Sequence, residues 1–120
     1  MGRIYDSELK ILEVLWKHGD TTASDIARIL GEECDWSRTT TYTVIKKCVQ
    51  KGLVARKNPK FICQPLITKK QVREQETTLL VNKVFDGSSD LLIANLIDNK
   101  KISSEQLEKL RQFVLEESSP

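Results

Sequence analysis

The side chains with recognisable chemistry gather in the middle of the chain, between Ser37 and Lys60. Hydroxyl and cationic groups crowd this segment, and from residue 36 to residue 73 there are ten lysines and arginines but no aspartate or glutamate. Hydroxyls bond base edges and phosphates, and ammonium and guanidinium groups pair with phosphates. A stretch with so many like charges repels itself unless a polyanion neutralises it. The pattern therefore favours nucleic acid as the partner over a merely solvated basic face.

A helix predicted from Arg38 to about Lys51, with Ser37 as its N-cap and Gly52 as its C-cap, sorts these side chains onto two sides. The side expected to face the protein interior carries Thr41, Val44, Ile45, Cys48 and Val49. The opposite side is rich in threonine and tyrosine, which are mediocre helix formers, so that contact with a DNA groove explains them better than helix propensity does. The residues expected to bind DNA are Ser37, Arg38, Thr39, Thr40, Tyr42, Thr43, Lys46 and Lys47 on the helix, and Arg56, Lys57 and Lys60 after it.

Two shorter amphipathic helices are predicted before this one. The first covers about residues 7–17, with Asp6 or Ser7 as its N-cap, and the second begins after Thr22 and stops at Gly31. After the third helix, short apolar runs flank a basic stretch at residues 56–60, which is typical of a β-hairpin with a basic tip. Three helices followed by a hairpin are the order of a winged helix-turn-helix, so the expected fold class is mainly α with a small β-hairpin.

The remainder of the chain predicts a second domain. Residues 1–67 are expected to form a winged-helix DNA-binding domain and residues 68–120 a three-helix dimerisation domain, with capping boxes that begin at Thr68 and Ser103. Residues 91–97 are apolar on nearly every side, and about fifty residues bury such a helix poorly on their own, so a second copy of the chain is the natural cover. The residues expected to form the dimer are Leu79, Leu91, Leu92, Leu96, Leu107, Leu110 and Val114.

Composition argues against several other classes of protein. The chain has 120 residues, 39% hydrophobic and 30% charged, and no apolar run reaches the roughly 18 residues of a membrane span, so a cytoplasmic protein is expected. Cys34, Cys48 and Cys63 are odd in number and widely spaced, which indicates reduced thiols, and Cys48 and Cys63 are interpreted as small core residues. With His18 as the single histidine, neither a metal site nor a cofactor is expected. No Ser-His-Asp grouping or glycine-rich phosphate loop points to an enzyme.

Several short segments spread along the chain form a specific combination, although each alone is weak. They are Ser7–Leu9 with Val14 and Trp16, Asp35–Ser37 with Thr40, Thr43, Lys47, Lys51 and Gly52, then Val84–Gly87, and Ala94–Leu96. Together with the basic hairpin they resemble the penicillinase repressor family, on the branch of BlaI and MecI. The copper-responsive branch carries a cysteine cluster near its C-terminus, and this chain has no cysteine after Cys63, so a copper response is not expected.

The resemblance implies a homodimer that binds double-stranded operator DNA and represses genes for a β-lactamase or a penicillin-binding target. It also implies inactivation by a protease linked to a membrane-bound antibiotic sensor. In the family the cut falls between an asparagine and a bulky apolar residue, and the matching pair here is Asn95 and Leu96. The chain departs from the family at Leu96, where phenylalanine is common, and at Arg38 and Thr39, where proline and lysine are usual.

Three alternatives stay open at this point. The winged helix could be a protein-interaction module, although such modules are expected to expose acids on the third helix and none occurs from Ser37 to Gln50. The repressor could respond to a small molecule or another signal in place of proteolysis. Asn95 could be a polar residue tolerated at a helix interface, with no role in cleavage.

Overall fold

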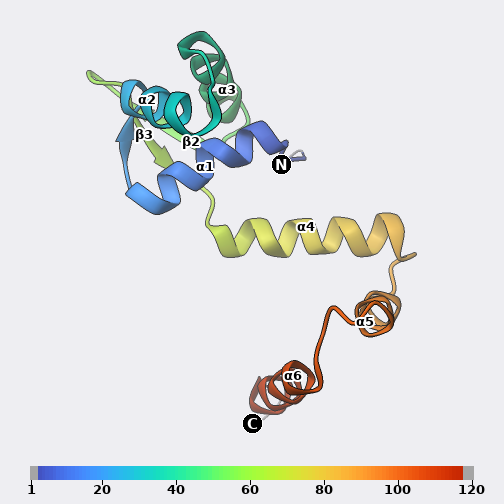
Figure 1. The fold of residues 1–120 in the computed structure, drawn as a ribbon. Coiled ribbons are helices and arrows are strands. Elements are labelled where there is room, and N and C mark those ends of the chain that lie inside the picture. The colour runs from blue at the N-terminus through green and yellow to red at the C-terminus, as the bar shows by residue number, and fades with distance from the viewer. Residues whose placement is uncertain (1–2, 118–120) are drawn as a thin grey trace. The chain divides into compact units, whose positions relative to one another are not determined.

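A computed structural model describes residues 3–117, without the side chains of Val114 and Glu117. The predicted dimerisation residue Val114 therefore lies outside the described side chains. Within the described range the chain forms six helices and three strands (Figure 1). In chain order they are α1 (Asp6–His18), β1 (Thr21–Thr22), α2 (Ala23–Cys34), α3 (Arg38–Gln50), β2 (Val54–Lys57), β3 (Ile62–Pro65), α4 (Lys69–Val84), α5 (Ser89–Asp98) and α6 (Ser104–Glu117). The chain divides into two compact units, Met1–Arg73 and Glu74–Pro120.

The first unit is a winged helix-turn-helix, as predicted. Helices α1, α2 and α3 pack on one another, and β2 and β3 form the expected hairpin (Figure 1). Strand β1 was not foreseen: it pairs antiparallel with β3, with Thr21 opposite Cys63, and completes a three-stranded sheet in the order β1-β3-β2. Only two residues long, β1 carries no periodicity that a sequence pattern could reveal.

The core of the first unit lies between its three helices and the sheet. The largest fully buried apolar side chains are Ile11, Leu12, Leu15, Ile26, Leu30, Ile45, Leu53 and Val54. The core also includes Ile67 and Val72, and the indole N–H of Trp16 donates to the Ile67 carbonyl oxygen at 3.0 Å. The packing of this unit therefore continues past Pro65 into the first turn of α4.

Local capping sets most of the helix starts, and these predictions are confirmed. The side chains of Thr22 and Ser37 each accept a hydrogen bond from the backbone N–H three residues later. Reciprocal capping boxes open α4 and α6, because Gln71 and Gln106 accept from the backbone N–H groups of Thr68 and Ser103, whose hydroxyl oxygens accept in return.

Two predicted boundaries were wrong. The N-cap of α1 is Tyr5, and not Asp6 or Ser7, because the Glu8 carboxylate accepts from the Tyr5 backbone N–H and so begins the helix one residue earlier. Helix α2 does not stop at Gly31 but continues to Cys34, and Asp35 ends it with a left-handed φ of 57°. Gly31 is an ordinary position within the helix, since a Cβ there would lie 3.5 Å from the Trp36 carbonyl oxygen, a normal van der Waals contact.

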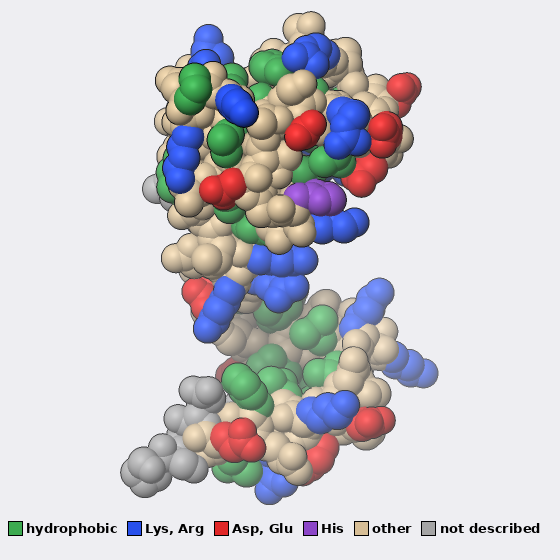
Figure 2. Space-filling view, turned by 90° about the vertical axis from the view of Figure 1, so that its left-hand side faces the viewer, with side chains coloured by type: hydrophobic (Ala, Val, Ile, Leu, Met, Phe, Trp, Pro, Cys, Tyr) green, Lys and Arg blue, Asp and Glu red, His purple; other side chains and the backbone are tan. Residues whose placement is uncertain are grey.

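The second unit has little buried surface. Helix α5 has no buried residue, and Leu91, Ile93 and Ile97 are each more than two-fifths exposed. Figure 2 shows green hydrophobic side chains gathered on the surface of this unit, in the lower part of the view. No helix in the described part of the chain combines the length and the apolar character that a membrane crossing requires.

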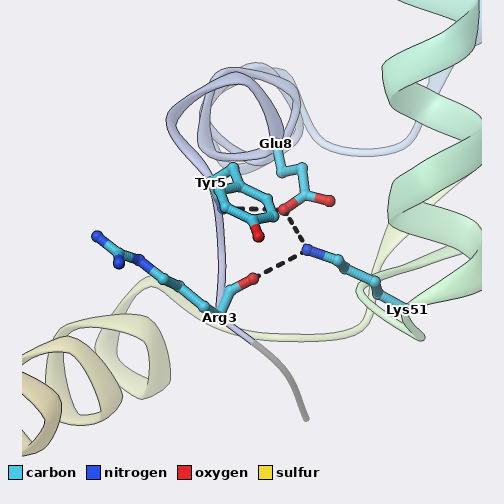
Figure 3. Close-up of polar contacts among 4 residues, drawn as sticks. All are labelled: Arg3, Tyr5, Glu8 and Lys51. Carbon is cyan, nitrogen blue, oxygen red and sulfur yellow. Dashed lines mark hydrogen bonds and ion pairs between the residues drawn. The ribbon is translucent and has the colours of Figure 1, made fainter.

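A buried ion pair joins the start of α1 to the end of α3 (Figure 3). The Lys51 ammonium donates to Glu8 Oε1 at 2.7 Å and to the Arg3 carbonyl oxygen at 2.9 Å, and it lies 4.4 Å from the centroid of the Tyr5 ring. The Glu8 side chain is only 1% exposed, whereas that of Lys51 is 28% exposed. Among the described residues no hydrogen-bond partner reaches Glu8 Oε2, so this carboxylate depends on Lys51 for its compensating charge.

We expect Lys51→Met to lower the free energy of unfolding by about 3 kcal/mol, because it leaves the Glu8 carboxylate buried without a counter-charge. Urea denaturation measures this loss. The control Lys47→Met removes an exposed lysine from the same helix and is expected to change stability by less than about 0.5 kcal/mol. The double variant Glu8→Gln/Lys51→Met removes both charges and should recover more than half of the loss; an equal loss in the single and double variants would contradict this account.

Candidate nucleic-acid interface

The ends of α3 are fixed by its own sequence. Ser37 accepts from the Thr40 N–H at 3.1 Å, and its carbonyl oxygen accepts from the buried Thr41 hydroxyl at 3.2 Å. At the other end Gly52 adopts a φ of 77°, and the Leu53 N–H donates to the Cys48 carbonyl oxygen at 2.9 Å. The helix therefore has a defined length and leads directly into β2.

The two sides of α3 separate almost as the sequence predicts. The buried residues are Thr41, Val44, Ile45 and Cys48. The exposed ones are Arg38, Thr39, Thr40, Thr43, Lys46, Lys47 and Gln50. Val49, predicted to be interior, and Tyr42, predicted to be on the outer side, are both half-buried. The Tyr42 ring loses exposure because Phe61 lies beside it, with the ring centroids 6.0 Å apart.

An open depression of about 490 Å³ runs along the first turns of α3. It is lined by Arg38, Thr39, Tyr42, Thr43 and Lys46, all of which the sequence singled out. The Thr43 hydroxyl donates to the Thr39 carbonyl oxygen at 2.9 Å, so its oxygen remains able to accept. The surface thus offers donors, an acceptor and methyl groups together, which are the groups that read base edges in a major groove.

The hairpin places more cations beside this helix. Lys57 and Lys60 are exposed, and the guanidinium carbon of Arg56 lies 3.7 Å from the centroid of the Phe61 ring. In the part of the chain that the structure describes, the ion pairs involve Arg28, Lys51, Lys109 and Arg111, and none involves a cation of α3 or of the hairpin. Among the described residues, the cations of this surface therefore have no ion-pair partner.

Sequence reasoning missed two features of this region. Lys51 belongs to the carboxylate-free stretch but pairs with Glu8, so it is not part of the exposed cationic surface. A signal was present, because Glu8 shares the apolar face of α1 with Ile11, Leu12 and Leu15. Phe61 gave no comparable signal, since its contact with Tyr42 joins residues far apart in the sequence, and its contact with Arg56 depends on how the hairpin turns.

The cysteines lie away from this surface. Burial raises the pKa of the Cys48 thiol to about 12, and the nearby Glu8 charge acts in the same direction. Burial likewise raises the pKa of Cys63 to about 11, against a smaller lowering by Arg56. Both thiols are therefore protonated at neutral pH and pack as small apolar groups. Within the described residues, no three histidine, cysteine or acidic side chains are grouped so as to hold a metal ion.

A winged helix-turn-helix with a cationic, hydroxyl-bearing third helix defines the class of DNA-binding regulators. A family model described as "Penicillinase repressor" matches residues 4–116 of this chain. The chain therefore belongs to the penicillinase repressor family, whose members are transcriptional repressors and not enzymes.

Individual relatives agree with this assignment. The penicillinase repressor of Bacillus licheniformis is 26% identical over 117 residues, which cover 96% of this chain and 91% of that protein. The methicillin resistance regulatory protein MecI of Staphylococcus aureus is 25% identical over 113 residues, 92% of each chain.

Two solved structures match somewhat more than half of this chain. The DNA-binding domain of the repressor BlaI matches with a TM-score of 0.53 at 25% identity, over 57% of this chain and 87% of that one. The Bacillus licheniformis BlaI monomeric form, in complex with the blaP half-operator, matches with a TM-score of 0.50 at 25% identity, over 58% of this chain and 88% of that one.

Proposed function

We propose that the protein is a homodimeric repressor that binds a pseudo-palindromic operator through α3 and the hairpin. The observation that carries this proposal is the surface of hydroxyls and cations along α3 and the β2–β3 hairpin, where the cations have no ion pair among the described residues. A duplex supplies both the phosphates and the base edges that such a surface needs. The BlaI relative in complex with a half-operator supports the same role for the matching part of this chain. A repressor of this kind acts on DNA inside the cell, so we place it in the cytoplasm.

The regulated genes are proposed to serve resistance to β-lactam antibiotics. This proposal rests on the names of the relatives, a penicillinase repressor and a methicillin resistance regulator, which match over more than nine-tenths of this chain. We propose residues 1–67 as the DNA-binding domain and residues 68–120 as the dimerisation domain.

Dimerisation through the second domain is supported by its uncovered apolar surface. Leu79, Leu91 and Leu110 are each between 42% and 49% exposed, and Leu92, Leu96 and Leu107 are half-buried within the single chain. A unit of about fifty residues with so few buried side chains gains little from the hydrophobic effect by itself. A second copy that covers these leucines supplies the missing burial and sets two α3 helices about one turn of DNA apart, roughly 34 Å.

The proposed inactivation is a cut between Asn95 and Leu96. Both lie inside α5, where the Asn95 carbonyl oxygen accepts from the backbone N–H and the side chain of Asn99. A protease that binds its substrate in an extended form requires α5 to open first. Few buried contacts oppose that opening in the single chain, because α5 has no buried residue. Release from DNA by another signal is the alternative.

Operator binding is tested with duplexes selected by the protein from a random pool. If about six phosphates are contacted per dimer, the logarithm of the binding constant falls with the logarithm of salt concentration with a slope of about −5. Thr43→Ala should weaken binding to the selected duplex and leave binding to mixed-sequence DNA nearly unchanged. Lys57→Ala should weaken binding to both. A slope near zero, or no retained DNA at low salt, would instead favour a protein-interaction module.

The dimer surface is tested with Leu91→Glu. Leu91 is the third residue of α5, where a glutamate is favourable for the helix, so a loss of the dimer reports on the interface and not on helix formation. We expect sedimentation to show a monomer. Ser89→Glu adds the same charge in the same turn without removing apolar surface, and should remain a dimer; an intact Leu91→Glu dimer would refute the placement.

Cleavage is tested in cells that contain the native protein. After exposure to a β-lactam, mass spectrometry should find a fragment that ends at Asn95, and Asn95→Ala should abolish it. If the promoter is derepressed while the protein stays full-length and no such fragment is found, the result would favour another inducing signal.

A further inference from the structure

Two arginines of the DNA-binding surface are held by aromatic rings that also touch each other. The guanidinium carbon of Arg38 lies 5.0 Å from the centroid of the Tyr42 ring, and its Nη2 donates to the Tyr42 hydroxyl oxygen at 3.0 Å. The Tyr42 and Phe61 rings meet edge to face at 84°. Arg56 covers Phe61 at 3.7 Å. We call these four residues, Arg38, Tyr42, Phe61 and Arg56, the arginine-aromatic stack.

The stack joins two elements that otherwise carry cations independently. Arg38 and Tyr42 belong to the first turns of α3, whereas Arg56 lies on β2 and Phe61 directly precedes β3. The Phe61 backbone is itself fixed, because its carbonyl oxygen accepts from the Ala23 N–H at 3.0 Å. Phe61 has a left-handed φ of 50°, which glycine adopts more easily. A phenylalanine at this position therefore has a conformational cost, which its ring contacts offset.

Stacking leaves an arginine able to bind. An aromatic ring covers the flat face of the guanidinium group and leaves its edge free to bind. One N–H of Arg38 Nη2 is used by the Tyr42 hydroxyl, and the remaining N–H groups stay available for phosphate oxygens or for guanine O6 and N7. Neither arginine has an ion pair among the described residues. A long side chain that is already held in place loses less conformational entropy on binding, so the stack raises affinity without adding a contact to DNA.

We propose that Tyr42 and Phe61 are positioning residues that hold Arg38 and Arg56 as a pre-arranged pair for one duplex, and that they fix the hairpin against the recognition helix. Arg38 lines the depression on α3 and is assigned to a guanine edge in the groove. Arg56 lies outside that depression, on the hairpin, and is assigned to a phosphate. This inference rests on the proposed function, because it concerns how the same surface binds DNA.

The stack itself is tested in the free protein. Ring currents from Phe61 should shift the NMR signals of the Arg56 side-chain protons upfield. Phe61→Leu should abolish the shift and Phe61→Tyr should keep it. Leucine suits the comparison because it has the same backbone requirements as phenylalanine and remains apolar. Absence of the shift in the unaltered protein would overturn the inference without any DNA measurement.

The effect on binding is tested with a 30-base-pair duplex that the unaltered protein selects from a random pool. Phe61→Leu should weaken binding about fivefold, and Phe61→Tyr less than twofold. In an Arg38→Ala/Arg56→Ala background, Phe61→Leu should cost less than twofold, because the groups through which it acts are gone. An equal loss in both backgrounds would show a merely structural role and overturn the inference.

The same titrations separate the two proposed contacts. Arg38→Ala should relax the sequence preference at one base pair. Arg56→Ala should weaken binding to all duplexes alike and reduce by about 1 the slope of the logarithm of the binding constant against the logarithm of salt concentration. If Phe61→Leu does not fold, Tyr42→Leu breaks the stack from the helix side. Because Tyr42 also lines the depression, its loss counts for positioning only if it falls below twofold in the Arg38→Ala/Arg56→Ala background, and an equal loss in both backgrounds overturns the inference. Failure of the unaltered protein to select any duplex overturns the proposed function and this inference with it, whereas selection with unchanged Phe61→Leu affinity overturns the inference alone.

Discussion

The contact on which the first unit depends is the buried ion pair between Glu8 and Lys51. It ties the first turn of α1 to the residue that ends α3, so the helix that carries the candidate DNA contacts is anchored at its far end. A carboxylate that is 1% exposed and has one unpartnered oxygen is costly in any other arrangement of the two helices. The pair therefore selects one packing of α3 against α1, and the apolar side of α3 completes the same core.

That anchoring explains how the charges are divided. Lys51 is neutralised inside the protein, while the cations on α3 and on the hairpin have no acidic partner in the described residues. At the near end of α3, Tyr42 and Phe61 connect the helix to the hairpin. Contacts of a few side chains therefore hold α3 in place at both of its ends. The cations on its surface repel one another, so it is the fold that keeps them together.

The second unit follows the opposite principle. The first unit encloses a core of fully buried side chains, but α5 buries none, and large apolar side chains of α4, α5 and α6 remain exposed. The chain belongs to a family of transcriptional repressors, and we propose this uncovered surface as the contact between two copies of the chain. The same weak internal packing suits the proposed cleavage within α5, because a helix with few buried contacts opens at little cost.

The sequence by itself determined what depends on neighbours three or four residues apart. The caps at Thr22, Ser37, Thr68 and Ser103, the two sides of α3, and the hairpin all followed from such local patterns. Only the tertiary structure decided the pairing of β1 with β3, the continuation of α2 past Gly31, the partner of Lys51 and the ring contacts of Phe61. Each of these depends on groups that the fold brings together from distant parts of the chain or on backbone angles that packing selects, and no local periodicity records either.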